Sequence, residues 1–385
     1  MVKVLSKENN KSVVCFFLSK SYILFSKKGD DIGGAEVNLY YLATHLAKNN
    51  SFKIKFLVGD YGQPYRQMIE GVELIRIRYL NDQIYPGFFH KLLRRVSFIW
   101  ELLKLKSDVI ITSTANEFCG YIALTKVWSS TKLLFRVAHD WDVNGRFTQS
   151  GSYMGLLYGF ALKRFERIVC QNEDQRRKLL QVEGLESVVI KNGFPLSREI
   201  NNNISRNFIL WIARSDSFKR PHLFLDLALR LPSEKFIMIM PGTGNLKEEI
   251  LHRSKKIPNL SVIDYVPFLE IFKYFREAKC FVNTSDSEGF PNTFLQCCLN
   301  GTPILSYLVD PDKIIQEYGL GFVCHDDPER GAEFIRGLTS EGIKKFSNRM
   351  QAYMIENHDL NQTTLEYERI IYTLIEKNRN DFGNE

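Results

Sequence analysis

The sequence lacks features that define several protein classes. No apolar run approaches the roughly 20 residues of a membrane-spanning helix, and the first stretch, MVKVLSKENNKSVVCFFLSK, contains no small-residue cleavage site. There is no internal repeat and no low-complexity block. These absences predict a globular protein that stays in the cytoplasm.

Paired cysteines and the common phosphate-binding fingerprints are also missing. The 7 cysteines, an odd number, lie in apolar runs without a CxxC pair, which predicts reduced thiols in cores. The GGAE stretch near the start is not GxGxxG, and no Lys-Ser/Thr follows the Gly-x-Gly of PGTGN. The sequence therefore gives poor support to a dinucleotide site and excludes a P-loop.

Composition sets the size and the charge of the protein. The chain has 385 residues, 44% apolar and 25% charged, which is ordinary for two or three globular domains. Lysine and arginine number 51 against 44 acids, a net charge of +7. This bias is compatible with anionic ligands and acidic lipid surfaces, but it is too weak to indicate a nucleic-acid partner.

Strands and helices alternate along the chain. A buried strand at 12–18, a glycine turn, a helix and a strand at 53–59 form a βαβ unit, and similar units follow. A polar linker, SREINNNISRN, marks the best boundary. We expect an α/β protein with domains at 1–200 and 201–365 and a helical tail at 366–385.

The richest set of candidate ligand-binding residues lies in the stretch DSEGFPNTFLQCCLNGTPILS, residues 286–306. It follows an apolar strand and predicts a tight turn, a short buried helix and a second strand. Unpaired N–H groups at the helix start suit an anion such as a diphosphate. Because Pro291 has no N–H, the donors would be Phe290, Asn292 and Thr293, with the Glu288 carboxylate at the rim. A lone turn of this kind also occurs in many α/β domains.

The full pattern, a strand, SxxEGFPNxFLxxxxxGTPIL and a strand, resembles the donor-site signature of retaining GT-B glycosyltransferases, family 4 in particular. The resemblance implies two doubly wound Rossmann-like domains facing a cleft, with a last helix that crosses back to the first domain. It implies sugar transfer from a UDP-, GDP- or ADP-sugar to an acceptor hydroxyl of a glycan or lipid-linked acceptor. No metal or other cofactor is expected.

The resemblance also implies roles for residues of this stretch. Glu288 would bind hydroxyls of the donor sugar, and the backbone after it would hold the distal phosphate. The family motif is E-x7-E, but its second position is Gln296, which would bind the nucleotide ribose without a carboxylate charge. We expect this change to weaken binding by ~1 kcal/mol. The implied donor-binding residues here are Gly289, Phe290, Pro291, Asn292, Thr293 and Gln296.

Cations and a base contact are implied further along the second domain. Arg214 and Lys219 match the pair that the family uses to neutralise the donor diphosphate, although Ala213 replaces the family's glycine. Their alternative is a solvated surface charge. The family clamps the nucleotide base near a strand end that corresponds here to Tyr265–Pro267, which includes Val266.

In the first domain the resemblance points to two places. Gly33 and Gly34 match a donor-facing glycine loop, with a plain tight turn as the alternative. His139 ends a strand where relatives place a histidine against the donor sugar, with a structural histidine as the alternative. The DxD letters of Asp140-Trp141-Asp142 are a short match that arises by chance, so a metal site is not expected.

The helical segment at 90–106 has Leu, Val, Phe, Ile and Trp on one side and basic residues on the other. The sequence favours an ordinary core-facing helix. A helix lying on an anionic membrane surface stays open, and it would place the protein at the inner face of the cell membrane. That location fits assembly of a surface polysaccharide on a lipid carrier.

Two other functions remain open from the residues. A nucleotide-sugar epimerase or a phosphorylase can share the fold, but a hydrolytic epimerase needs carboxylates beyond Glu288, and no convincing pair is present. A catalytically degenerate protein that binds nucleotide or serves as a scaffold is supported mainly by Gln296.

Overall fold

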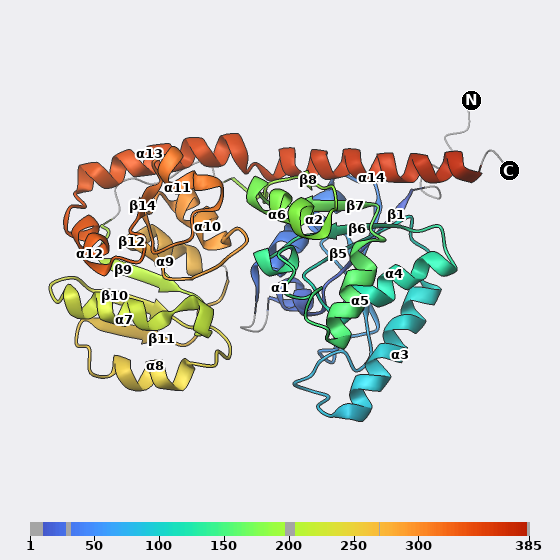
Figure 1. Cartoon of the computed structure of the whole chain (residues 1–385), viewed down its shortest axis with the longest axis horizontal. Coiled ribbons are helices and arrows are strands. Elements are labelled where there is room, and N and C mark those ends of the chain that lie inside the picture. Colours follow the sequence, from blue (N-terminus) through green and yellow to red (C-terminus); the bar gives the residue numbers. More distant parts are fainter. Residues whose placement is uncertain (1–10, 28–31, 197–204, 269, 383–385) are drawn as a thin grey trace. The chain divides into compact units, whose positions relative to one another are not determined.

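The computed structural model describes residues 11–27, 32–196, 205–268 and 270–382, which fall into two units (Figure 1). Unit 1 takes its described residues from Met1–Lys28, Ile32–Gly193 and Leu360–Glu385, and unit 2 takes them from Phe194–Asp359. The domain boundary expected at residues 200 and 201 lies outside the described residues. The end of the chain belongs to unit 1 from Leu360 onward.

Unit 1 contains a sheet in the order β3-β4-β2-β1-β5-β6-β7-β8, in which β3 pairs antiparallel with β4 and the other neighbours are parallel. All residues of β5 are buried, as expected for a parallel strand covered on both faces. The strands are β1 (Val13–Phe17), β2 (Lys53–Val58), β3 (Arg66–Ile69), β4 (Val72–Arg76), β5 (Val109–Ser113), β6 (Lys132–Arg136), β7 (Arg167–Cys170) and β8 (Val188–Val189).

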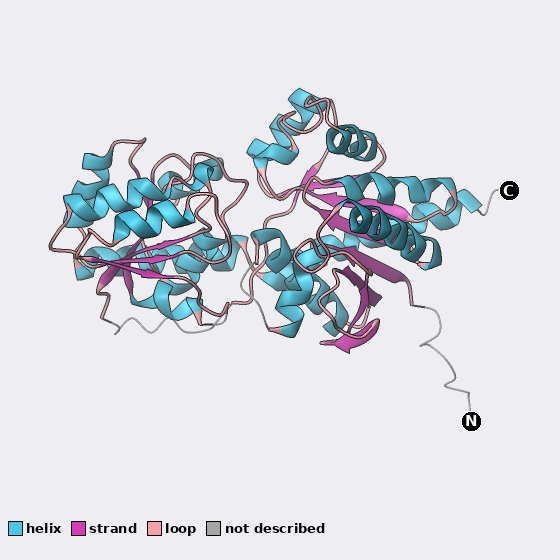
Figure 2. Cartoon of the chain, turned by 90° about the horizontal axis from the view of Figure 1, so that it is seen from below, coloured by secondary structure: helices cyan, strands magenta, loops and turns pink. Residues whose placement is uncertain are grey.

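Helices cover both faces of this sheet (Figure 2). One core joins side chains of α2 and α14 to the sheet, and the other joins α3, α4 and α5 to its opposite face. The helices of unit 1 are α1 (Tyr22–Ser26), α2 (Gly34–Lys48), α3 (Phe88–Lys104), α4 (Glu117–Leu124), α5 (Tyr153–Leu162), α6 (Glu173–Glu183) and α14 (Leu360–Phe382).

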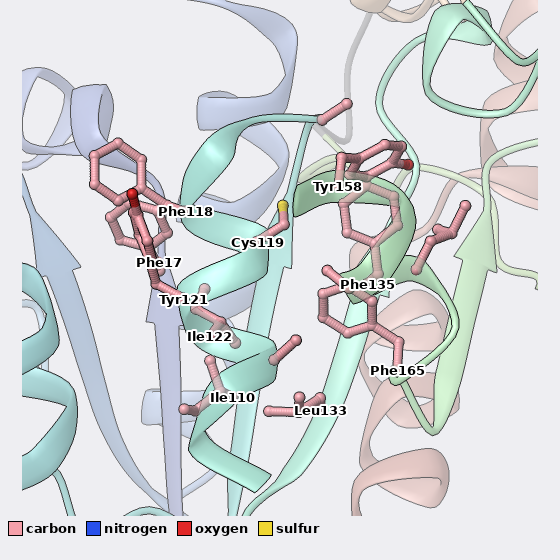
Figure 3. Packing of buried hydrophobic residues seen from close by; sticks show 14 of the residues in the cluster. Phe17, Ile110, Phe118, Cys119, Tyr121, Ile122, Leu133, Phe135, Tyr158 and Phe165 are labelled. Carbon is pink, nitrogen blue, oxygen red and sulfur yellow. The ribbon is translucent and has the colours of Figure 1, made fainter. Parts of the chain in front are cut away.

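The second of these cores supports the segment that follows β6. Figure 3 shows aromatic and aliphatic side chains of the strands packed against α4 and α5. Phe135 of β6 packs against Tyr158 of α5, with ring centroids 5.6 Å apart. The Tyr158 hydroxyl donates a hydrogen bond of 2.8 Å to the carbonyl oxygen of Asp142. The core therefore fixes the turn that contains His139.

Unit 2 is a parallel sheet in the order β11-β10-β9-β12-β13-β14. Counted along the chain, this is the 3-2-1-4-5-6 order of a Rossmann fold. Its strands are β9 (Phe208–Ile212), β10 (Phe236–Ile239), β11 (Leu260–Ile263), β12 (Ala278–Asn283), β13 (Ile304–Ser306) and β14 (Gly321–Val323). Its helices are α7 (Pro221–Arg230), α8 (Lys247–Ser254), α9 (Ile271–Glu277), α10 (Asn292–Asn300), α11 (Ile314–Glu317), α12 (Pro328–Arg336) and α13 (Ser340–Asn357). The expectation of two Rossmann-like α/β domains is confirmed.

Two features of unit 1 differ from the expectations. The hairpin of β3 and β4 was not anticipated, and its turn residues Glu70 and Gly71 have φ values of 51° and 79°, as short hairpin turns require.

The preferred core-facing interpretation of α3 is correct only in part. Phe98 and Leu102 are buried, but other large apolar side chains of α3 face solvent. The helix carries apolar residues on two opposite sides.

Among the described helices, none combines the length and the apolar sequence that a bilayer span requires.

Buried thiols give a first testable prediction. All 7 cysteines are free and buried, and burial raises the pKa of Cys170 and of Cys324 to about 11. At pH 8 about one such thiol in a thousand is a reactive thiolate. We therefore expect Ellman's reagent to label almost no thiol in the native protein and all 7 in denaturant. Rapid labelling of the native protein would contradict this packing.

Candidate functional site

The candidate site lies at the carboxyl edge of the unit 2 sheet, where β9 and β12 are neighbours. Along the chain, β9 leads to β10 on one side, whereas β12 leads to β13 on the other side. Ligands of open parallel sheets bind outside such a switch point. The loop after β9 contains Arg214 and Lys219, and the loop after β12 contains Glu288. The topology thus brings the expected cations and the expected carboxylate to one place.

Lys219 and Glu288 form an ion pair across the two loops. Their side chains are 17% and 11% exposed, so the pair is largely shielded from water. The Ser285 hydroxyl donates a hydrogen bond of 2.8 Å to the same Glu288 oxygen, Oε1. The Asp286 N–H donates to the Phe218 carbonyl at 3.0 Å, which joins the two loop backbones. An anion that enters here would compete with Glu288 for Lys219.

Arg220 connects these loops with a third loop, the one after β14. Its Nε donates to the carbonyl oxygen of Thr284 at 2.7 Å, and its two terminal nitrogens donate to Asp326 at 2.9 and 2.8 Å. Arg220 adopts a left-handed conformation with φ of 46° just before α7. No local sequence pattern marks Arg220, because its partners are far away in the chain.

Arg214 lies in a different environment from Lys219. Its guanidinium forms an ion pair with Asp216 at 2.9 Å, and its side chain is 46% exposed. The structure therefore places Arg214 in the same loop as Lys219 but pairs it with a carboxylate of that loop. An ion pair as exposed as this contributes little to stability.

The N-terminus of α10 borders the ion pair. The helix begins at Asn292, Pro291 is its N-cap, and no side chain caps it with a hydrogen bond. The first N–H groups of a helix have no acceptor within the helix, and they suit an anionic ligand. Phe290 is buried with its ring 5.3 Å from that of His358, which fixes the turn of Glu288 and Gly289. The expected phosphate-binding backbone, including Thr293, thus lies beside Glu288 in the chain.

Gln296 is nearly buried in α10, at 6% exposure. Its backbone oxygen accepts a hydrogen bond of 2.8 Å from the Asn300 side chain. Burial disfavours an uncompensated charge far more than a neutral amide. The glutamine is therefore easier to accommodate here than the glutamate of the family motif when no ligand is bound.

Val266 follows β11, which is the edge strand of the same sheet. It is buried at 8% exposure, whereas the neighbouring Tyr265 is 39% exposed. The aromatic ring of Tyr265 is the more accessible surface for a base. The role expected for Val266 stays a prediction.

Gly33 and Gly34 begin α2 in unit 1, and both are exposed. Gly33 has an extended backbone with φ of −97°, which any residue adopts. A Cβ at Gly33 would meet only the end of the flexible Glu36 side chain. Local geometry therefore gives no reason for a glycine at this position, and its expected role in donor binding stays a prediction.

His139 follows β6 and caps a short 3-10 turn, Asp140–Asp142. Its Nδ1 accepts a hydrogen bond of 3.1 Å from the Trp141 N–H, and the two rings are 4.2 Å apart. These contacts fit the structural alternative, and they fix the ring in one orientation. The role of His139 toward a sugar stays a prediction.

The two acids of the DxD letters have separate partners. Asp142 accepts three backbone hydrogen bonds, from Ala115 at 3.0 Å, Ala138 at 2.8 Å and His139 at 2.9 Å. Burial raises the pKa of Asp142, although these bonds oppose that rise. Asp140 pairs with Lys178 instead. Within the described residues, no group of three or more histidines, cysteines and acids is arranged to hold a metal ion.

Models of glycosyltransferase families match both units. The family model for glycosyl transferases group 1 matches residues 206–341, and the model for glycosyltransferase family 4 matches residues 32–198. No curated protein matches the chain.

Several solved structures share the fold. Sucrose-phosphate synthase from Thermosynechococcus elongatus has a TM-score of 0.77 at 12% identity, covering 95% of this chain and 100% of that chain. TarM from S. aureus, solved with UDP, has a TM-score of 0.73 at 11% identity, and the match covers 94% of this chain and 99% of that chain. HepE from Anabaena, solved with UDP-glucose, has a TM-score of 0.69 at 14% identity, and the match covers 94% of this chain and 99% of that chain. At these identities the likeness shows the fold alone.

Replacing Arg220 tests whether it holds the three loops together. A lysine keeps the charge but cannot reach Thr284 and both oxygens of Asp326 at once. We expect Arg220→Lys to lower the free energy of unfolding by about 1–3 kcal/mol. Urea denaturation measures this change. Arg230→Lys is the matched control on α7, because Arg230 and its partner Glu329 are 46% and 51% exposed. Equal stability of the two variants would show that Arg220 does not hold the loops.

Proposed function

We propose that this chain, a glycosyltransferase of the GT-B fold that resembles family 4, transfers a sugar from a nucleotide-sugar donor to an acceptor with retained anomeric configuration. The acceptor would be a hydroxyl group of a glycan or of a lipid-linked glycan. The observation that carries the proposal is the Lys219–Glu288 pair beside the N-terminus of α10. A cation, helix N–H groups and a carboxylate together suit a sugar diphosphate.

The pair explains how one small site serves two parts of the donor. An entering diphosphate offers Lys219 more negative charge than Glu288 does, so Lys219 would exchange partners. Glu288, still held by Ser285, would then accept hydrogen bonds from sugar hydroxyls. The charge of the ligand thus completes a site that is neutral at rest.

The proposed reaction needs no nucleophilic side chain. The bond between the anomeric carbon and the phosphate oxygen breaks, and the acceptor oxygen bonds to the same face of the sugar. The acceptor proton passes to an oxygen of the leaving phosphate. Lys219 and the first N–H groups of α10 would stabilise the charge that develops on that phosphate. The product then has the anomeric configuration of the donor, which NMR of the product reads directly.

The biological setting proposed is surface-polysaccharide or glycan assembly at a membrane. TarM and HepE were solved with UDP or UDP-glucose, which supports a UDP-sugar as the first donor to test. The net charge of +7 and the exposed apolar side chains of α3 support work at an anionic lipid surface. A glycan carried by a lipid would be within reach there.

Replacing Lys219 tests the site. A thermal-shift panel of UDP, GDP and ADP first identifies the nucleotide, because a bound ligand raises the apparent stability. We then expect Lys219→Met to weaken binding of the nucleoside diphosphate about tenfold, or by ~1.4 kcal/mol, because a charged partner is lost. Calorimetry measures this affinity. Binding of the free nucleoside should not change.

Lys279→Met is the matched control for this test. Lys279 pairs with Glu234 in the same unit, with exposures of 18% and 22%, and it lies at the opposite end of β12. This control should bind the diphosphate like the wild type. Unchanged diphosphate affinity of Lys219→Met would contradict the electrostatic role.

Gln296 separates an active transferase from a degenerate nucleotide-binding protein. We expect Gln296→Glu to tighten binding of the nucleotide by about 1 kcal/mol through a charge-assisted hydrogen bond to the ribose. The gain should vanish with the 2′,3′-dideoxy nucleotide, which lacks the hydroxyl groups. If the wild type binds no nucleotide and turns over no donor, and the variant does both, the chain is a degenerate transferase.

A further inference from the structure

The outer side of α3 is apolar and exposed. Its side chains there are Phe88 (83% exposed), Phe89 (68%), Leu92 (49%), Val96 (58%), Trp100 (56%) and Leu103 (50%). At about 100° per residue, these positions fall within about 120° of the helix circumference. They form a continuous stripe along a helix of about 25 Å, and we call this set the outer stripe. A stripe of this size is far more than scattered surface apolar residues.

The inner side of α3 fixes the helix to unit 1. Phe98 and Leu102 are buried in the core, and Glu101 accepts a hydrogen bond of 2.6 Å from the Tyr65 hydroxyl. Arg94 and Arg95 bind Glu117 of α4 at 3.0 and 2.6 Å. Figure 1 shows α3, in cyan, on the side of unit 1 opposite α14. The outer stripe is therefore held outward by a helix that is already anchored.

The exposed charged side chains of α3 itself are basic. The only acid in α3 is Glu101, which is buried and lies 3.8 Å from the Lys104 amino group, whereas Lys91 and Lys104 are exposed. The Lys104 amino group lies 4.7 Å from the centre of the Trp100 ring. Aromatic and leucine side chains beside lysine are typical of helices that lie in a membrane interface. Lysine is depleted in protein interfaces, which makes a protein partner the poorer fit.

We propose that the outer stripe of α3 inserts into the headgroup region of an anionic bilayer and holds unit 1 at its surface. Phe88, Phe89, Trp100 and the aliphatic side chains enter the interface, while Lys91 and Lys104 contact lipid phosphates. This surface rests on the membrane setting proposed above and specifies how the protein would bind there, but it does not depend on the proposed reaction. Nucleotide binding, measured separately, distinguishes a failure of one proposal from a failure of the other.

Vesicle co-sedimentation of the full chain tests the proposal. We expect the protein to sediment with phosphatidylglycerol vesicles at low salt and weakly with phosphatidylcholine vesicles. Phe89→Ser/Trp100→Ser should reduce this binding at least tenfold without changing the melting temperature, since both side chains are exposed. The matched control is Leu229→Ser/Ile355→Ser, whose residues in unit 2 are 57% and 60% exposed.

Several outcomes of these measurements would contradict the proposal. A wild type that stays in the supernatant with phosphatidylglycerol vesicles at low salt overturns the proposal. Undiminished binding of Phe89→Ser/Trp100→Ser does the same. A wild-type dimer that becomes monomeric in this variant, without vesicle binding, would assign the outer stripe to a second copy instead. If Lys91→Glu/Lys104→Glu binds phosphatidylglycerol vesicles as tightly as the wild type, the proposed contact with anionic lipid is wrong.

Discussion

Two loops of unit 2 must meet because the strands before them are neighbours. β9 and β12 pair in parallel, and the chain leaves them in opposite directions along the sheet. Their loops therefore end side by side at the carboxyl edge, where the Phe218 carbonyl accepts the N–H of Asp286. The Lys219–Glu288 pair follows from that backbone contact. The rest of the site, including the start of α10, takes its position from the same strands.

The electrostatics of this edge favour a site that changes partners. Lys219 is largely shielded from water, so its charge would be costly without a partner, and so would that of the Glu288 carboxylate. As a pair they are neutral, and in the proposed exchange a ligand anion would take the place of Glu288. Arg220 limits how far the loops can move during such an exchange, because it holds Thr284 and Asp326 at once. The proposed rearrangement would then be confined to the side chains of Lys219 and Glu288.

The sequence predicted what depends on short-range patterns. Buried runs such as FILWI and the EGFP turn before α10 were recognisable, since their signals lie within a few residues. Lys219 and Glu288 were found from a family resemblance, but their direct contact was not. Arg220 was missed because its partners Thr284 and Asp326 are 64 and 106 residues away. Long-range pairs of this kind have no local signature in a single sequence.

Helix α3 shows a second limit of prediction from a single sequence. Its apolar residues were assigned to one side, yet Phe98 is buried and Trp100 is exposed, two positions apart on a helix and about 160° from each other. Composition alone cannot say which apolar face meets the core, because both faces satisfy a helical period. The packing decides it, because Phe98 and Leu102 enter the core while Arg94 and Arg95 bind Glu117 of α4. The outer stripe stays exposed, and it is the surface that we propose meets lipid.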